Sequence, residues 1–310
     1  MDVVILSRCD FARKHIGEVR QHAPGSRIVF DTVDLHFLRQ DREADLFGDP
    51  EVKRQAQEKC DLEYELIDQA DETWVVSPVE QELLRLARPQ KSIEVVSNIV
   101  EVSGSVVPFA MRRDLLFIGS FQHPPNTDAV IFFTKEIFPL VRARLPEVRF
   151  YVIGDKAPPE IVSLATEDVV ITGYQPDVAV FFNTIKVSVA PLRYGAGVKG
   201  KINQSMGFGV PVVATPIAAE GMSLTNRSDI MIAEEPGDFA EKLIELYQSE
   251  ELWQRISRNA LLKTKELFSR ETARRQLEHL LNDDHSKNLS PSPALASPLR
   301  EQAASEPIMS

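Results

Sequence analysis

Two glycines and two lysines stand close together in the second half of the chain. Gly195 and Gly197 form a turn after an apolar strand, and Lys199 and Lys201 follow at the start of a short helix. Glycines let a ligand approach the backbone, and the free N–H groups at a helix start suit phosphate. The start of a helix carries partial positive charge and does not favour cations. Two lysines at this position therefore indicate that an anion binds between them and the helix start. The stretch therefore predicts a cradle for a phosphate or a diphosphate.

The periodicity of the short helix predicts which lysine faces the ligand. Apolar residues recur every four positions over 198–206 and predict the buried stripe. Gln204 lies three residues after Lys201 and shares its face, whereas Lys199 points away when it is fully helical. We therefore expect Lys201 to contact the ligand first and Lys199 second. The alternative is a tight strand-turn-helix unit whose lysines are solvated.

A second loop follows the next buried strand, at 212–214. Glu220 and Gly221 belong to this loop, beyond the carboxyl end of the strand. Open parallel sheets bind ligands at this end. Since the glycines, the lysines and this loop converge on one sheet edge, we favour a ligand site over solvated lysines.

The stretch from 191 to 215 carries a longer pattern. It reads P-L-R-x-G-x-G-x-K-x-K, then a helix, then G-x-P-V-V-A-T. This pattern resembles the nucleotide-sugar-binding domain of GT-B glycosyltransferases of the family 4 type, and the resemblance extends over residues 114–281. It implies an α/β GT-B fold, in which two Rossmann-like domains with parallel sheets face a cleft. The family's helix carries a Glu-x7-Glu pair, where this chain has Ala196 and Gln204.

The resemblance also implies which other loops meet the donor. The loop after the strand at 114–118 approaches the donor diphosphate, and the loop after 169–172 approaches the base. Asn126 is equally well explained by the helix N-cap region, Tyr174 by a partly buried surface aromatic, and Arg193 by an ion pair. The expected donor-binding residues are Gly119, Phe121, Asn126, Tyr174, Arg193, Gly195, Gly197, Lys199, Lys201, Gln204, Glu220 and Gly221.

Asp34 and His36 follow the apolar strand at 28–30. A carboxylate near an imidazole orients or tunes a general base, or binds acceptor hydroxyls and the departing phosphate. We expect His36 and Asp34 to be the catalytic pair. The alternative is a helix N-cap by Asp34 and a solvated His36, with Arg39 and Arg42 pairing with the acidic residues that follow them.

Strands and helices alternate along the chain, which predicts two parallel sheets. We place an acceptor-side N-terminal domain at 1–105, the donor domain at 106–282 and a disordered tail at 283–310. The N-terminal domain is expected to be incomplete, because the opening units of the resembling family are absent and a strand at 3–6 that belongs inside the sheet comes first. A single helix is predicted at 128–144, and a final helix near 270–281 is expected to cross back to the first domain.

The composition argues against several classes of protein. A net charge of −11 argues against a nucleic-acid partner. The two cysteines, Cys9 and Cys60, lie far apart without metal-binding spacing, so neither a disulfide framework nor a metal site is expected. No signal segment or long apolar span is present, so a cytoplasmic protein is expected, with peripheral membrane contact left open. No cofactor is expected, since the nucleotide sugar is a substrate.

The resemblance implies a retaining, metal-independent transfer of a sugar from a nucleotide-sugar donor. The acceptor is the hydroxyl of a glycan, a lipid-linked molecule or a small molecule, and the expected setting is the assembly of surface polysaccharide or other glycans. Two alternatives stay open: a non-catalytic nucleotide-sugar-binding module or degenerate subunit, and a GT-B nucleotide-sugar epimerase. A partner chain that completes the N-terminal domain is also left open.

Overall fold

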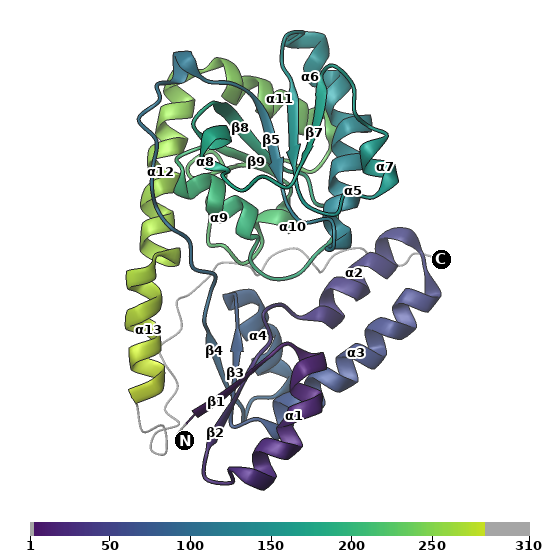
Figure 1. Cartoon of the computed structure of the whole chain (residues 1–310), viewed down its shortest axis with the longest axis vertical. Coiled ribbons are helices and arrows are strands. Elements are labelled where there is room, and N and C mark those ends of the chain that lie inside the picture. The colour runs from purple at the N-terminus through teal and green to yellow at the C-terminus, as the bar shows by residue number, and fades with distance from the viewer. Residues whose placement is uncertain (1–2, 283–310) are drawn as a thin grey trace, which may run out of the picture.

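The computed structural model describes residues 3–282, which form two parallel β-sheets with helices packed on them (Figure 1). The first sheet has four strands in the order β1-β2-β3-β4. Its unit comprises β1 (Val3–Ser7), α1 (Cys9–His22), β2 (Arg27–Asp31), α2 (His36–Phe47), α3 (Pro50–Gln69), β3 (Glu72–Val75), α4 (Pro78–Ala87) and β4 (Ser92–Val95). The disordered tail predicted at 283–310 lies outside the described residues.

Strand β1 lies at the edge of this sheet. Within residues 3–282 it pairs with β2 alone, with Val3 opposite Arg27 and Ser7 opposite Asp31. The expectation that this strand lies inside the sheet is therefore wrong for the described part of the chain. Its apolar sequence did not distinguish the two positions, because an edge strand also packs one face on the core.

The first sheet is buried on both faces by alternate side chains of its strands. Ile28 and Phe30 of β2 point into a cluster with residues of α1, α3 and α4, while Val29 between them points the other way. Val29 packs with Trp74 and with Leu280 of α13 (Arg270–Asn282). The last helix therefore returns to the first sheet, as the resemblance implied, and runs along it in Figure 1.

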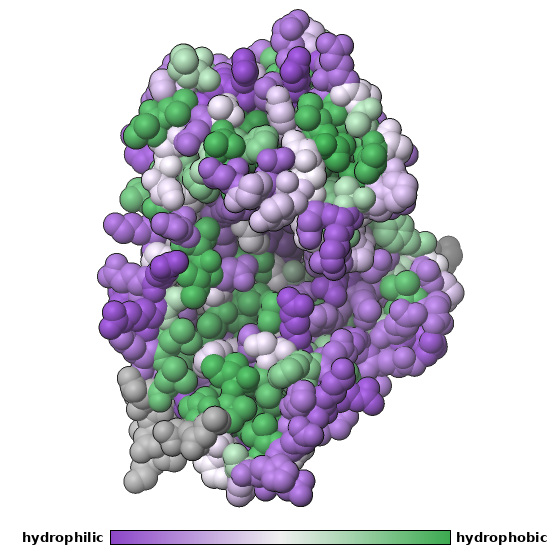
Figure 2. Space-filling view, viewed as in Figure 1, coloured by the Kyte–Doolittle hydropathy of each residue, from purple (hydrophilic) through white to green (hydrophobic). Residues whose placement is uncertain are grey.

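Helices α2 and α3 form a hairpin that the sequence did not fully predict. Gly48 ends α2 in the left-handed region at φ 66°, and Asp49 caps α3 by accepting hydrogen bonds from the N–H groups of Glu51 and Val52. The alternative of an N-cap at Asp34 implied a helix where α2 lies, but nothing in the sequence indicated that this helix packs against α3. Figure 2 shows mainly hydrophilic side chains over α3, as expected of a helix whose outer face is solvated.

The second sheet has six parallel strands in the order β10-β9-β8-β5-β6-β7. Its unit comprises η1 (Phe109–Met111), β5 (Arg113–Ile118), α5 (Pro124–Phe132), η2 (Phe133–Ile137), α6 (Phe138–Arg144), β6 (Phe150–Ile153), α7 (Pro159–Val162), β7 (Val169–Gly173), α8 (Ala179–Phe182), β8 (Ile185–Ala190), α9 (Gly200–Gly207), β9 (Val212–Ala214), α10 (Pro216–Ala219), β10 (Met231–Ile232), α11 (Pro236–Gln248) and α12 (Glu250–Phe268). Every residue of β8 and β9 is buried, which agrees with the apolar runs in the sequence.

Two local expectations for this unit need correction. The single helix predicted at 128–144 is three consecutive segments, because η2 is a π-helical turn and Pro139 lies at the start of α6. The loop after β9 contains the short helix α10, capped by Thr215. Neither change moves a strand of the sheet.

The segment between β4 and η1 joins the two units without a helix or strand. The domain boundary predicted at 105/106 falls in this segment. None of the helices between residues 3 and 282 combines the length and the apolar character needed to cross a bilayer.

Candidate functional site

The strand order of the second sheet marks where a ligand would bind. The chain builds β5, β6 and β7 in one direction, then returns to the other side of β5 to place β8, β9 and β10. The carboxyl ends of β5 and β8 therefore border the point where the order reverses, which is where open α/β sheets form a binding crevice. The loops that follow these two strands carry most of the predicted donor-binding residues.

Lys201, on α9, lies against the first turn of α5. Its Nζ donates a hydrogen bond to Asn126 Oδ1 at 2.9 Å, and Asn126 Nδ2 donates to the Ser120 carbonyl at 2.6 Å. Nζ also lies 5.4 Å from the centre of the Phe117 ring. Burial, together with the nearby charge of Lys199, lowers the pKa of Lys201 to about 7. An anion bound here would restore the charged form.

Asn126 does not act as the N-cap of α5. The residue at that position is His123, and Asn126 lies inside the helix with its amide group shared between Lys201 and Ser120. This buried amide joins the loop after β5 to the start of α9. The two predicted donor residues, Asn126 and Lys201, are thus brought into direct contact.

Lys199 turns back into the glycine turn. It is the N-cap residue of α9 and is not helical, and its Nζ donates to the carbonyls of Ala196 at 3.0 Å and Gly197 at 2.6 Å. Burial lowers its pKa to about 8. Within residues 3–282, neither Lys199 nor Lys201 forms an ion pair. The alternative of solvated lysines is therefore wrong for Lys199, which is buried.

The glycines allow the two domains to approach each other. Gly197 has φ 69°, and a Cβ there would lie 3.0 Å from Asp34 Cβ and 3.2 Å from a methyl group of Val76. At Gly221, with φ 73°, a Cβ would lie 2.6 Å from Ser77 Cβ. Both predicted loops of the second domain therefore meet the first domain at glycines, and a side chain at either position would push the walls apart.

His36 and Asp34 lie side by side at the start of α2. His36 Nε2 is 3.7 Å from Asp34 Oδ1, and His36 Nδ1 is 3.0 Å from Glu63 Oε1. Burial alone would disfavour the imidazolium, but Cys9, Glu63 and Asp34 outweigh it and raise the pKa of His36 to about 10. The ring lies between two carboxylates, with 16% of its side chain exposed.

The alternative of an N-cap by Asp34 is not what the structure shows. The buried Glu63 accepts hydrogen bonds from the backbone N–H groups of His36 and Phe37, and so it satisfies the start of α2. Asp34 instead accepts from Arg39 at 2.7 Å. His36 is therefore not a solvated residue, and Asp34 lies between Arg39, His36 and Gly197.

Helix α2 reaches across the cleft to the second domain. Arg42 donates to both carboxylate oxygens of Glu220, at 2.7 and 2.9 Å, and to the Gly195 carbonyl at 2.7 Å. Tyr194 donates to Glu43 at 3.3 Å. Two residues predicted to meet the donor, Gly195 and Glu220, are therefore held by the first domain. Arg39 and Arg42 do not pair with the acidic residues that follow them, contrary to the alternative given above.

The remaining predicted donor-binding residues do not contact Lys199 or Lys201 through a side-chain hydrogen bond among the described residues. Arg193 forms a bidentate ion pair with Asp128, with Arg193 Nε and Asp128 Oδ2 3.0 Å apart. The expected alternative for Arg193, an ion pair with an acidic residue, is therefore present. Phe121 is buried, and Gly119 lies against Asn126. Tyr174 is 72% exposed after the edge strand β7. Gln204 is half-buried on α9. The donor roles of these residues stay predictions.

Three residues of the site were not predicted. Burial lowers the pKa of His123 to about 4, and the nearby charges of Arg39 and Lys201 act in the same direction. Glu80 is buried, accepts hydrogen bonds from the N–H groups of Leu35 and Val76, and has a pKa raised by burial to about 7. Only Glu80 had a sequence signal: the Ser-x-x-Glu spacing from Ser77 is a capping box. Arg42 is the third, and its partner lies in the other domain.

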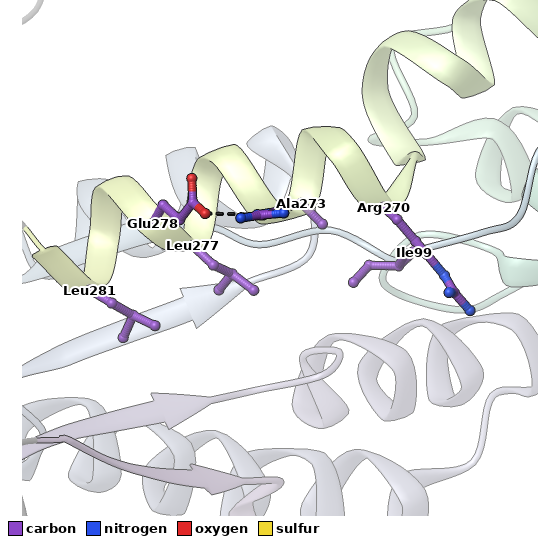
Figure 3. A pocket seen from close by; sticks show the side chains of 7 residues that line it. Ile99, Arg270, Ala273, Leu277, Glu278 and Leu281 are labelled. Atoms are coloured by element: carbon purple, nitrogen blue, oxygen red, sulfur yellow. Dashed lines mark hydrogen bonds and ion pairs between the residues drawn. The ribbon is translucent and has the colours of Figure 1, made fainter.

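Three cavities formed by the described residues lie outside the lysine cradle. One of about 840 Å³ adjoins the Arg42–Glu220 contact and is lined in part by Arg193 and Pro216. A second, of about 520 Å³, is lined in part by Gly221. The third, of about 430 Å³, runs along α13, where Leu277 and Leu281 line an apolar hollow (Figure 3). The hollow along α13 contains none of the predicted site residues.

The two facing parallel sheets, with binding loops at the strand-order reversal, define a protein of the GT-B fold. Residues 112–249 match the family model described as "Glycosyl transferases group 1", which confirms the resemblance drawn from the sequence. Comparison of the sequence with curated proteins gave no match.

Solved structures share this fold at low sequence identity. TarM of S. aureus has a TM-score of 0.71 at 16% identity, over 91% of this chain and 55% of TarM. Sucrose-phosphate synthase from Thermosynechococcus elongatus has a TM-score of 0.71 at 14% identity, over 90% of this chain and 72% of that one. HepE of Anabaena has a TM-score of 0.70 at 13% identity, over 90% and 77%. The chain thus spans about half the length of TarM.

Proposed function

We propose that this chain transfers a sugar from a nucleotide-sugar donor to a hydroxyl acceptor. The observation that carries the proposal is the contact of Lys201 with Asn126 at the start of α9, beside the glycine turn that Lys199 holds. This arrangement offers lysine amino groups, which a bound anion would keep charged, and free helix N–H groups at one point. The match of residues 112–249 to group 1 glycosyltransferases supports it.

In the proposed reaction, the cradle stabilises the departing nucleoside diphosphate. Negative charge develops on the diphosphate as the sugar leaves, and Lys201 and the N–H groups of α9 are fixed in position before that happens. Asp34 lies across the cleft, next to Gly197, with His36 beside it, where the reacting sugar and the acceptor hydroxyl would meet. We assign to them the orientation of the acceptor. Retention of the anomeric configuration is part of this proposal and follows from the resemblance.

The ligands of the structural neighbours suggest which substrates to try first. HepE of Anabaena was solved with UDP and glucose and with UDP-glucose. A mutant of TarM was solved with fondaparinux, α-GlcNAc-glycerol and UDP. We therefore propose a uridine nucleotide donor and a glycan-type acceptor. The proposed setting is the cytoplasmic assembly of surface polysaccharide or other glycans. Peripheral membrane contact and a partner chain that completes the first domain are also parts of the proposal.

The donor is identified by thermal-shift measurements with UDP-, GDP-, ADP- and dTDP-sugars. A ligand that binds the folded state raises the melting temperature by mass action. Wild type and Lys135→Ala, which changes an exposed lysine of η2, should show the same shift with one nucleotide, and Lys201→Ala should lose it. The preferred donor is then incubated with acceptors, and the product is detected by mass spectrometry. Equal shifts in Lys201→Ala would contradict the assigned cradle.

A non-catalytic donor-binding module is the second candidate. It is favoured by Gln204 and Ala196, which stand where the resembling family carries glutamates, because an amide supplies no negative charge. Such a module would bind the nucleotide through Lys201 and release neither free nucleotide nor product with any acceptor. The product assay distinguishes the two functions.

A further inference from the structure

Cys9, His36 and Glu63 bring three metal-binding atoms together at one point of the first domain. The atoms Cys9 Sγ, a His36 ring nitrogen and a Glu63 carboxylate oxygen all lie within 4.8 Å of one another. Cys9 begins α1, His36 begins α2, and Glu63 lies in the middle of α3. Cys9 and Glu63 are each 0% exposed, while His36 is partly accessible.

The distances suit a tetrahedral ion of the zinc type. Typical bond lengths to such an ion place a nitrogen and an oxygen ligand about 3.3 Å apart, and a nitrogen and a sulfur ligand about 3.6 Å apart. His36 Nδ1 lies 3.0 Å from Glu63 Oε1 and 3.9 Å from Cys9 Sγ. Both separations involve the same nitrogen and depart from the tetrahedral values by a few tenths of an ångström, in opposite directions.

The surroundings already orient the three groups. Glu63 is held by the backbone N–H groups of His36 and Phe37, one on each carboxylate oxygen. The other ring nitrogen of His36 lies 3.7 Å from Asp34 Oδ1. A carboxylate behind a metal-bound histidine fixes the tautomer of the ring and makes it a better ligand. Asp34 would take that role on moving a few tenths of an ångström, since 3.7 Å is just beyond hydrogen-bond distance.

The nearby cations are neutralised by other partners. Lys59 donates to Asp10 at 2.9 Å, and Arg39 donates to Asp34 at 2.7 Å. Cys9 as a thiolate and Glu63 as a carboxylate would together balance the two charges of a divalent ion. Cys9 is a free cysteine.

We propose that Cys9 Sγ, His36 Nδ1 and Glu63 Oε1 bind a divalent transition-metal ion of the zinc class, with water at the fourth position. On binding, the thiol and Nδ1 give up their protons to solvent, and the ion takes their place. The ion would join α1, α2 and α3, and so fix the helix that carries Arg42 to the second domain. The site shares His36, with Asp34 behind it, with the residues assigned above to the acceptor, but metal binding does not require that assignment.

This site departs from the expectation that the chain has no metal site. Its three residues are separated by 27 positions and again by 27 positions, so no local spacing indicates them. The competing account of the same geometry is an imidazolium paired with Glu63, with Cys9 as a buried apolar residue. The two accounts differ in whether Cys9 is a ligand.

Cobalt(II) distinguishes them, because a thiolate bound to cobalt(II) gives an intense charge-transfer absorption. The full chain is treated with a chelator, dialysed and titrated with cobalt(II), as wild type and as Cys60→Ser. Cys9 and Cys60 are the two cysteines of the chain, so a thiolate band in Cys60→Ser comes from Cys9 without requiring that a Cys9 variant fold. We expect this band to saturate at one equivalent, zinc to displace cobalt, and Asp34→Asn to weaken zinc binding by about 10- to 100-fold.

Two results would overturn the proposal. One is the absence of the band in Cys60→Ser, and the other is a band that persists unchanged in Cys9→Ser. The zinc content of the freshly purified protein, measured by inductively coupled plasma mass spectrometry, should approach one equivalent per chain and should fall in Glu63→Gln. Circular dichroism of each variant shows that the loss of metal is not a loss of fold.

Discussion

Arg42 of α2 donates hydrogen bonds from both terminal nitrogens of its guanidinium group to the carboxylate of Glu220, at 2.7 and 2.9 Å, across the cleft between the two domains. The same guanidinium donates to the carbonyl of Gly195 in the glycine turn. Both side chains of the pair are partly buried, at 24% and 28% exposure. A bidentate pair of this kind fixes orientation as well as distance.

We expect this pair to couple the two domains energetically. In a double-mutant cycle of Arg42→Ala and Glu220→Ala, the coupling free energy from urea unfolding should be about 1 kcal/mol or more. The exposed pair of Arg54 and Glu58 on α3 is the matched control and should show a much smaller coupling, since solvent screens it. Equal couplings for the two pairs would show that the cleft contact has no special role.

The low pKa of Lys201 predicts proton uptake when a nucleoside diphosphate binds. Its pKa of about 7 lies below the usual value, so between about pH 7 and pH 10 the unfolded chain holds more protons than the folded chain. This lysine therefore makes the free energy of unfolding of the free protein rise with pH across that window. A bound anion raises the pKa of Lys201 toward its usual value and so removes this dependence of the free energy of unfolding on pH.

Calorimetry in buffers of different ionisation enthalpy measures this uptake. At about pH 8, where the diphosphate is already ionised, wild type should take up protons on binding, and affinity should fall as the pH rises further. Lys201→Arg keeps its charge and should show a smaller uptake and a flatter pH profile. Proton release by wild type, or an identical profile in Lys201→Arg, would argue against a buried lysine at the diphosphate.

Gly197 should tolerate no side chain. Gly197→Ala combines a left-handed backbone at φ 69° with a Cβ contact of 3.0 Å to Asp34, so we expect a loss of about 1–3 kcal/mol in the free energy of unfolding and weaker donor binding. Gly17 lies inside α1 with open space around its Cβ position. Gly17→Ala should instead gain about 0.5–1 kcal/mol. Thermal unfolding of both variants checks this contrast. A stable Gly197→Ala protein with normal donor binding would show that the close approach of Gly197 to Asp34 is not needed for folding or for donor binding.

Much of the fold was predictable because buried parallel strands leave continuous apolar runs. The strands expected at 3–6, 28–30, 114–118, 169–172 and 212–214 lie within a residue of their observed bounds. The preference for Lys201 over Lys199 as the first contact of the ligand stays a prediction. The edge position of β1 was not predictable, because an apolar run does not report which neighbours it pairs with.

The unpredicted parts of the site depend on contacts between distant segments. Arg42 and Glu220 are 178 positions apart, and their contact requires both the α2–α3 hairpin and the facing of the two domains. Lys199 follows the helix phase in sequence, yet it lies outside the helix as its N-cap and turns back to the carbonyls of the glycine turn. Local periodicity did not indicate this, because the first residue of a helix is free to leave the helical path.

Calorimetric titration of the preferred nucleoside diphosphate into wild type, Lys201→Ala and Lys135→Ala shows whether the start of α9 binds a diphosphate. A charge-assisted hydrogen bond contributes about 1.5–3 kcal/mol, so we expect binding to be about 10- to 150-fold weaker in Lys201→Ala and unchanged in Lys135→Ala. Equal affinity in all three proteins, or no binding to wild type, would contradict a diphosphate cradle at the start of α9.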